Sequence, residues 1–379
     1  MRNIAVVTSN RSEYGLLKNI IEKIEISSEL ELSLIVTGSH LSKKYGETIN
    51  EILEDNYAIS AKISIINNNS ISNQMGLLMI KLDEIFDMLN PDIILILGDR
   101  YEMLAVANVA LVKNLPLAHI SGGERTEGLI DEQIRHSITK IANIHFPGAE
   151  EYAENIAKMG EERWRIFNVG DPGIENMKNI RLYEDKEIEE KIGFKVDKNT
   201  LIVTFHPVTL EIRNTEEYID NLIAALKKFN NKIIITYPNS DAGSNIIIDK
   251  IKEYEERNEN VKVFKSLGIQ LYLSVVKKCG VVVGNSSSGI VEAPYFKIPV
   301  VNIGNRQKGR LMAKNIINCN YDSNEIYNAI KKSLTDEYRE YVNKDTISLY
   351  GDGNTSEKIV EVLENINIDE KLIRKRLVW

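Results

Sequence analysis

Short hydrophobic runs alternate with longer amphipathic stretches along the whole chain. Runs such as IAVV and IILIL have no alternating polar positions, which is typical of strands buried on both faces of a parallel sheet. The stretches between them, such as Ile71–Leu89 and Tyr101–Lys113, have apolar residues at helical spacing. This order predicts an α/β fold in which helices connect parallel strands. In the first half, the expected strands are Ile4–Val7, Leu32–Val36, Ile63–Ile66, Ile93–Leu97, Leu117–Ile120 and Ile166–Val169.

The pattern is interrupted once, over the charged stretch Asp171–Lys198, and then begins again. We therefore expect two Rossmann-like domains facing a cleft, over residues 1–171 and 172–355. The last segment, 356–379, begins as a helix that can lie elsewhere on the surface or pack back on the first domain. Ligands of such sheets bind at the carboxyl ends of the strands. In the second half, the expected strands are Leu201–Thr204, Ile233–Thr236, Val261–Val263, Val281–Val283 and Val300–Ile303.

Composition and charge narrow the class of protein. The 379 residues are 43% hydrophobic and 27% charged, with a net charge of −8. An acidic chain argues against a nucleic-acid partner, which requires a basic face. No apolar run approaches the roughly 20 residues of a membrane span, and none near the start is long enough for a signal peptide. The two cysteines cannot form a disulfide framework. We expect a cytoplasmic protein without a membrane partner.

Charged residues gather after two strands of the first half. Asp99 and Arg100 follow the apolar run IILIL, where open α/β folds place functional groups. The segment HISGGERTEGLIDEQIRH at 119–136 brings Glu124 and Asp131 into the same region. Carboxylates in one pocket shift each other's pKa values, so that one serves as base and another as acid. The alternative interpretations are an Asp that caps a helix and a solvated loop.

A second set of residues follows the strands of the other half. His206 comes directly after Leu201–Thr204 and can polarise or protonate a reacting oxygen, although a lone histidine is often structural. The turn GNSSSGIVEAP at 284–294 leads into a helix, whose free N–H groups suit a diphosphate. Glu292 suits a ribose diol, while Arg306 and, from the first domain, Arg11 suit phosphates. No Gly-x-Gly-x-x-Gly follows a strand, so NAD is not indicated, and no metal-ligand cluster is present in the sequence.

Together these motifs resemble the hydrolysing UDP-N-acetylglucosamine 2-epimerases of sialic-acid synthesis. The resemblance rests on SNRSEYG, GDRYE, IDEQIRHSITK, FHPVT, PNSDAGS, GNSSSGIVEAP and NIGNRQKGR, which cover most of the chain in the family's order. It implies a GT-B-like pair of Rossmann domains and a C-terminal helix that returns to the first domain. It also implies a reaction that converts UDP-GlcNAc and water to N-acetylmannosamine and UDP through a glycal, without metal or redox cofactor.

The resemblance also implies roles for individual residues. Asp99 and Asp131 match catalytic carboxylates, and His206 matches the catalytic histidine. Asn239 lies at a sugar-side position, and Arg100 is a further candidate for substrate binding. The residues that match nucleotide contacts are Arg11, Ser286, Ser287, Glu292 and Arg306.

One departure from the family affects the chemistry. Where many members have Glu or His before the Gly-Gly pair, this chain has Ser121, and Leu16 and Leu17 stand near the position of a lysine in some relatives. A serine is no proton carrier at its ordinary pKa, so Glu124 or a water takes that role, or the sugar differs. The alternatives are the same chemistry on UDP-2,4-diacetamido-2,4,6-trideoxyglucose, as in legionaminic-acid synthesis, a GT-B glycosyltransferase, and a non-catalytic UDP-sugar sensor. The expected assembly is a homodimer or homotetramer.

Overall fold

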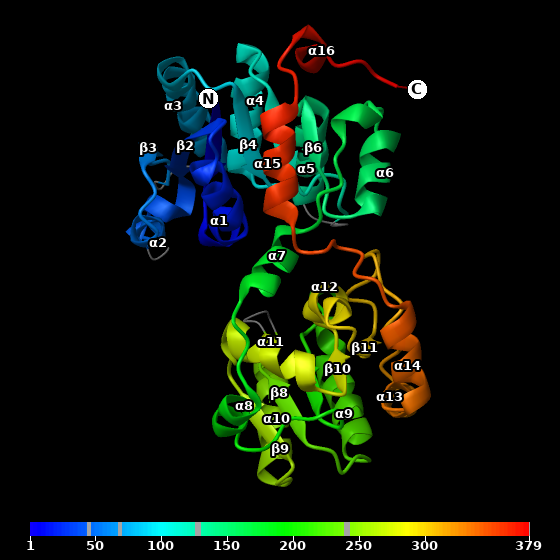
Figure 1. Ribbon diagram of the computed structural model, residues 1–379. Helices are drawn as coiled ribbons and strands as arrows, with labels where there is room; N and C mark the ends of the chain where they lie inside the picture. The colour runs from blue at the N-terminus through cyan, green and yellow to red at the C-terminus, as the bar shows by residue number, and fades with distance from the viewer. Residues whose placement is uncertain (44–46, 67–69, 126–129, 239–242, 379) are drawn as a thin grey trace. The chain divides into compact units, whose positions relative to one another are not determined.

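A computed structural model describes residues 1–43, 47–66, 70–125, 130–238 and 243–378. Its contacts divide the chain into two compact units (Figure 1). The first unit comprises residues 1–178 together with 350–379, and the second comprises residues 179–349. Each unit is built on one six-stranded sheet whose neighbouring strands pair in parallel, so the chain has the expected pair of Rossmann-like α/β folds.

The sheet of the first unit has the strand order β3-β2-β1-β4-β5-β6. Its strand β1 is buried on both faces: Ile4 and Val6 pack in one hydrophobic core, while Ala5 and Val7 pack in another. This explains why the run IAVV has no polar alternation, because both faces of the sheet are covered. The strands are β1 (Arg2–Thr8), β2 (Leu30–Thr37), β3 (Ile59–Ile63), β4 (Ile93–Leu97), β5 (Leu117–Ile120) and β6 (Ile144–Phe146).

Helices α1 and α15 contribute to the core on one face of this sheet, and α3, α4 and α5 contribute to the core on the other. The helices of the first unit are α1 (Arg11–Ile26), η1 (Gly38–Leu41), α2 (Ile49–Glu54), α3 (Ile71–Leu89), α4 (Tyr101–Lys113), α5 (Ile130–Ile141), α6 (Glu150–Lys158), η3 (Arg163–Arg165), α7 (Pro172–Asn179, whose last residue belongs to the second unit), α15 (Thr355–Asn365) and α16 (Glu370–Ile373).

The sheet of the second unit has the order β12-β11-β10-β7-β8-β9. Leu201 and Val203 of its central strand β7 pack in one core, and Ile202 packs in the core on the opposite face. The strands are β7 (Leu201–Thr204), β8 (Ile233–Thr236), β9 (Val261–Phe264), β10 (Val281–Gly284), β11 (Val300–Ile303) and β12 (Ile316–Cys319). The helices are α8 (Asp185–Ile192), η4 (Thr209–Asn214), α9 (Thr215–Leu226), α10 (Ser244–Glu256), α11 (Gly268–Lys278), α12 (Ser288–Tyr295), α13 (Ser323–Ser333) and α14 (Asp336–Asp345).

Two of the expected strands are wrong. Strand β3 ends at Ile63, so Ile63–Ile66 largely follows a strand rather than forming one. The expected strand Ile166–Val169 is reduced to a single bridge between Ile166 and His145. The edge strand here is the short β6, which the sequence pattern did not predict. It ends where Pro147 follows, and proline has no N–H to continue a ladder.

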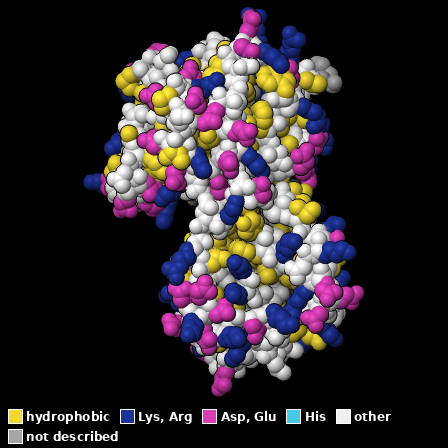
Figure 2. Space-filling view, viewed as in Figure 1, with side chains coloured by type: hydrophobic (Ala, Val, Ile, Leu, Met, Phe, Trp, Pro, Cys, Tyr) yellow, Lys and Arg dark blue, Asp and Glu magenta, His cyan; other side chains and the backbone are white. Residues whose placement is uncertain are grey.

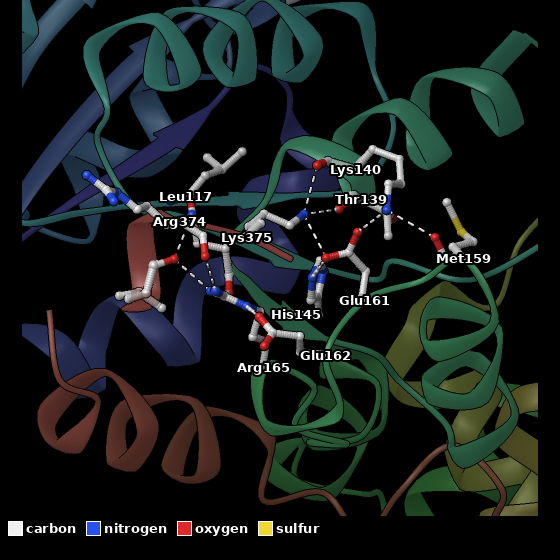
Figure 3. A network of polar contacts seen from close by, with 12 residues as sticks. Leu117, Thr139, Lys140, His145, Met159, Glu161, Glu162, Arg165, Arg374 and Lys375 are labelled. Carbon is white, nitrogen blue, oxygen red and sulfur yellow. Dashed lines mark hydrogen bonds and ion pairs between the residues drawn. The ribbon is translucent and has the colours of Figure 1, made fainter. Parts of the chain in front are cut away.

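The C-terminal segment packs on the first unit. Helix α15 contacts α1, and the residues beyond it are held by a polar network (Figures 1 and 3). At its centre, the fully buried guanidinium of Arg165 donates to the carbonyl oxygens of Lys371 and Leu372, each at 2.6 Å. Nearby, Lys375 Nζ lies 2.7 Å from the carboxylate of buried Glu161. The bonds from Arg165 satisfy carbonyls of the short helix α16, and Asn143 donates a further bond to the carbonyl of Leu372.

On the face shown in Figure 2, Lys and Arg side chains are interspersed with Asp and Glu over both units. Within the described residues, no helix is both long enough and apolar enough to cross a membrane.

Candidate active site

The turn after β4 carries the first candidate group. Gly98 has φ +83°, which lets the chain turn directly after the buried strand, and Asp99 follows it. The carboxylate of Asp99 accepts a hydrogen bond from Arg135, a residue of α5 that is 5% exposed. Arg135 also donates to the backbone carbonyl of Glu124, at 3.0 Å. The buried guanidinium of Arg135 thus contacts the side chain of Asp99 and the backbone of Glu124.

The surroundings of Asp99 raise the pKa of its carboxyl group, which suits a group that accepts a proton. Burial raises the pKa of Asp99; Arg135 lowers it again, while the nearby Asp131 raises it further, and the pKa stays above its ordinary value. Asp131 lies in the first turn of α5, one helical turn before Arg135. Asp99, Asp131 and Arg135 thus form one cluster of charges, and a raised carboxylate pKa is what a general base near neutral pH needs.

Arg135 was not among the expected site residues. Its spacing of four from Asp131 in IDEQIRH is the signal that places both on one helix face. His119 was also missed: its Nε2 lies 2.8 Å from the carbonyl oxygen of Gly98, which ties β5 to the turn after β4. Burial lowers the pKa of His119 to about 3, so its ring is neutral and structural.

Ser121, the departure from the family pattern, begins a tight turn after β5. Its φ is +63°, in the left-handed region, and its N–H donates to the carbonyl of Phe146 at 3.0 Å. Gly123, two residues on, has φ +79°, and a Cβ there would lie 2.3 Å from the carbonyl oxygen of Tyr152. The turn is thus fixed by its backbone, and the half-buried Ser121 contributes a short hydroxyl.

The two arginines of the first unit that were expected at the substrate are both paired with carboxylates. Arg11 Nε lies 2.9 Å from Glu51, and its side chain is 72% exposed, so this surface pair is weak. Arg100 donates to Glu102 through Nε at 3.1 Å and Nη2 at 3.2 Å. Asn239, expected on the sugar side, lies outside the described residues.

In the second unit, Asn285 organises the ends of three adjacent strands. Its Oδ1 accepts from the backbone N–H of His206 at 2.7 Å, and its Nδ2 donates to the His206 carbonyl at 2.9 Å. Its own carbonyl accepts from Arg306 Nη1 at 3.0 Å and from Gln307 Nε2 at 2.8 Å. Asn285 is fully buried, and the structure therefore assembles His206 and Arg306 around it. The sequence offers a weak signal for this role, an Asn between Gly284 and Ser286.

The approach of β10 to β7 requires a glycine. Gly284 lies opposite Thr204 in the sheet and has φ +132°. A Cβ at this position would lie 2.0 Å from the carbonyl oxygen of Thr204, and moving that backbone would displace His206 two residues later. The glycine of the GNSSSG turn is thus fixed by packing.

Helix α12 begins directly after this turn. Ser287 is its N-cap residue and forms no side-chain capping bond, while Ser286 Oγ accepts from the N–H of Ser288 at 3.4 Å. The dipole at the start of a helix favours negative charge. Glu292 lies one turn further along and is half-buried. Ser286 and Ser287 thus lie on the turn after β10, Glu292 lies in the helix that follows it, and Arg306 lies on the turn after the neighbouring strand β11.

The described residues contain no group of three or more His, Cys, Asp or Glu side chains that suits a metal ion. The expectation of a site without metal therefore stays a prediction, to be tested by chelation.

Comparisons with known proteins show the family and the fold of this chain. The profile of the family described as UDP-N-acetylglucosamine 2-epimerase matches residues 22–364. The chain belongs to this family. A GDP/UDP-N,N'-diacetylbacillosamine 2-epimerase (hydrolyzing) of Campylobacter jejuni is 39% identical over 97% of each chain. A UDP-N,N'-diacetylbacillosamine 2-epimerase (hydrolyzing) of Legionella pneumophila is 35% identical over 99% of each.

Another relative, a UDP-N-acetylglucosamine 2-epimerase of Neisseria meningitidis, is 33% identical over 100% of this chain and 99% of its own. Among solved structures, a UDP-N-acetylglucosamine 2-epimerase from Listeria monocytogenes aligns with a TM-score of 0.78 at 17% identity, over 96% of this chain and 95% of that one. A lipopolysaccharide outer core galactosyltransferase aligns with a TM-score of 0.55 at 13% identity, over 95% and 99%. The fold of this 2-epimerase family member is therefore GT-B-like, as expected.

Proposed function

We propose that this chain is a hydrolysing 2-epimerase that acts on a UDP-activated 2-acetamido sugar. The proposal rests on the ion pair between Asp99 and the buried Arg135, with Asp131 beside it. The chain that carries this pair belongs to the 2-epimerase family. Relatives whose names specify hydrolysing epimerases are 39% and 35% identical over nearly the whole length.

The reaction needs a base, a stabilised leaving group and water. A carboxylate, Asp99 or Asp131, removes the proton from C2 while the C1–O bond breaks and its electron pair leaves with UDP. The resulting double bond between C1 and C2 is that of a glycal. Water then adds its hydroxyl to C1, and C2 receives a proton on the opposite face. The products are UDP and the free 2-epimer of the sugar. General base catalysis of this kind contributes on the order of 10²–10⁴-fold.

The second unit supplies the nucleotide contacts in this proposal. Ser286 and Ser287 at the start of α12 receive the diphosphate, and Arg306 adds a positive charge from the next strand end. Fixed donors of this kind stabilise the charge that develops on the departing group. Glu292 accepts hydrogen bonds from the ribose hydroxyls, and His206 assists the diphosphate as it leaves. Arg11 and Arg100 are further phosphate contacts, and Asn239 contacts the sugar.

The identity of the sugar has two candidates. UDP-GlcNAc, which gives N-acetylmannosamine, is the substrate implied by the family resemblance. UDP-2,4-diacetamido-2,4,6-trideoxyglucose, which is UDP-N,N'-diacetylbacillosamine, is favoured by the names of the relatives that are 39% and 35% identical. A serine at position 121 does not carry a proton at its ordinary pKa, so Glu124 or a water carries the second proton. The short Ser121 side chain is compatible with either sugar.

Product analysis in heavy water tests the proposal. A hydrolysing 2-epimerase releases UDP and a free sugar that carries deuterium at C2. A GT-B glycosyltransferase would need an acceptor and leave C2 unlabelled, and a UDP-sugar sensor would form no product. Incubation with the two sugar nucleotides side by side, each at the same concentration, identifies the substrate by its larger kcat/KM. Release of an intact UDP-linked 2-epimer would contradict the hydrolytic step.

We also propose that the protein works in the cytoplasm as a homodimer or homotetramer. Both cysteines are free thiols, as expected of a reducing compartment. Light scattering coupled to size exclusion measures the assembly, and a monomeric mass at micromolar concentration would contradict it.

A further inference from the structure

Two buried carboxyl groups share one guanidinium in the first unit. Glu13, in the first turn of α1, is 5% exposed, and Glu102, in the first turn of α4, is fully buried. Arg100 forms two hydrogen bonds with Glu102, and its Nε also lies 3.9 Å from Oε1 of Glu13. Two carboxylates and one cation would leave a net negative charge in a buried place, which is costly unless a proton is retained.

Glu13 also connects the turns at the carboxyl ends of three strands. It accepts from the N–H of Ser9, directly after β1, at 2.8 Å, and the Ser9 hydroxyl lies 2.9 Å from the same carboxylate oxygen. The carbonyl of Ser9 accepts in turn from the N–H of Ser39, after β2, at 2.8 Å. Gly38 permits this approach, because a Cβ there would lie 2.6 Å from the Ser9 oxygen. Through Arg100, the same cluster reaches the turn after β4.

Burial favours the protonated form of Glu13. It raises the pKa of Glu13 to about 7, and the Glu102 carboxylate raises it as well, against the lowering effects of the Ser9 hydrogen bonds and Arg100. The titratable residue of η1 is His40, whose ring lies 3.1 Å from the hydroxyl of Thr8. Burial lowers the pKa of His40 to about 4, so it carries no charge near neutral pH.

We propose that Glu13 and Glu102 are positioning residues that together orient Arg100 toward the diphosphate of the substrate, with one proton kept between them. The proposal rests on the proposed function for the identity of that ligand. The Arg100 side chain is 44% exposed, so its guanidinium can reach solvent while Glu102 holds its other edge. When Glu13 loses its proton, a second carboxylate competes with the phosphates for Arg100. Binding of UDP then weakens, and the turn that carries Asp99 shifts with Arg100.

Glu13→Gln tests this because it keeps the shape of the protonated carboxyl group at every pH. We expect the wild-type protein to lose at least about threefold more UDP affinity than Glu13→Gln between pH 6 and pH 8.5, as measured by calorimetry. The melting temperature of the wild type should also fall relative to that of Glu13→Gln between pH 5 and pH 8, by about 3 °C or more. Glu102→Gln, which loses the partner of Arg100, should raise KM more than it lowers kcat.

Glu175 provides a matched control. It is a buried carboxylate that accepts from a serine in the same way, with Ser356 N–H at 2.8 Å and the Ser356 hydroxyl at 2.5 Å. Glu175→Gln should lower stability and leave the pH dependence of UDP affinity as in the wild type. Should Glu13→Gln fold poorly, Arg100→Gln serves instead: the extra loss of UDP affinity above pH 7 should disappear in it.

The experiments distinguish a failure of this positioning role from a failure of the proposed epimerase function. Parallel pH dependences of both UDP affinity and melting temperature in wild type and Glu13→Gln would overturn the shared proton and its role. A pH-dependent melting difference without UDP binding by the wild type would overturn the orientation of Arg100 toward a diphosphate. If the wild type binds UDP with the expected pH difference but converts neither UDP-sugar, the positioning pair stands and the epimerase proposal fails.

Discussion

Arg135 donates a hydrogen bond to the carboxylate of Asp99, which lies 36 residues earlier in the chain. The same guanidinium holds the backbone carbonyl of Glu124 at 3.0 Å. One buried cation therefore fixes the orientation of a carboxylate after β4 and the course of the loop after β5. Asp131 opposes the effect of Arg135 on the pKa of Asp99. The Asp99 carboxylate therefore keeps its basicity although it has limited access to solvent.

Asp99→Asn and Asp131→Asn keep the shape of the side chain but remove its negative charge. Each should lower kcat by at least about a hundredfold, because both are expected catalytic carboxylates and an amide lacks their basicity. UDP affinity should change little, since most of the expected nucleotide contacts lie in the second unit. Steady-state kinetics with calorimetric titration of UDP measures both. Asp83→Asn, which removes a surface partner of Lys113, is the control. Near-normal turnover in both active-site variants would show that this mechanism is wrong.

Arg306→Ala should raise KM and weaken UDP inhibition by about tenfold or more, because a phosphate partner contributes in the ground state and the transition state alike. Competition kinetics with UDP measures the effect. Arg310→Ala removes an equal charge from the same loop and should have a smaller effect. Equal UDP affinities of wild type and Arg306→Ala would remove Arg306 from the nucleotide site.

Asn285→Ala should lower kcat and raise KM together, since the side chain of Asn285 holds the backbone of His206 and so positions the turn whose carbonyl binds Arg306. We expect kcat/KM to fall by at least about tenfold, which corresponds to the loss of about 1.4 kcal/mol of transition-state stabilisation. Asn302→Ala removes another buried Asn from the neighbouring strand β11 and is the control for lost stability alone. A fall in activity no larger than that of Asn302→Ala would argue against a positioning role.

The contribution of Glu161 to the stability of the first unit depends on pH and is lost in acid. Burial would raise the pKa of Glu161, but the bonds from His145, Lys140 and Lys375 lower it to about 2. A lowered pKa in the folded state stabilises the protein above the ordinary value of 4.5, and this contribution is lost as the pH falls from there toward 2. Glu161→Gln should therefore lower the free energy of unfolding by about 3 kcal/mol at pH 7.

Urea unfolding at pH 7 and pH 3 checks this expectation. The difference between wild type and Glu161→Gln should shrink at the lower pH. Glu154→Gln, which breaks an exposed pair with Arg163, should change the free energy of unfolding little at either pH. A constant difference for Glu161→Gln would mean that its carboxylate contributes through packing rather than charge.

Chelation tests the expected absence of a metal requirement. Turnover should be unchanged after incubation with EDTA and gel filtration, and it should need no added NAD. Assays before and after treatment, with Mg²⁺ and Zn²⁺ added back in parallel, measure this. Loss of activity that either ion restores would overturn the metal-free mechanism.

Much of the α/β architecture follows from local pattern. The strands buried on both faces, such as β4 and β7, are recognisable because each is a continuous apolar run, and α3 and α4 were predicted with the bounds that the structure has. Residues with functional chemistry were recognisable at the turns after these strands, because a parallel sheet directs all its carboxyl ends to one edge. Family motifs then supplied the expected roles of Asp99, Asp131 and His206.

Edge strands were missed for a physical reason. Strand β12 is only partly buried, and β6 is three residues long, so neither has the hydrophobic signal of a central strand. The residues that hold the candidate site in place were missed for a different physical reason. Asn285 near His206, Arg135 on Asp99, and Glu13 beside Glu102 are pairs between residues far apart in the sequence. Such pairs leave no periodicity, because tertiary packing alone brings their polar atoms together away from water.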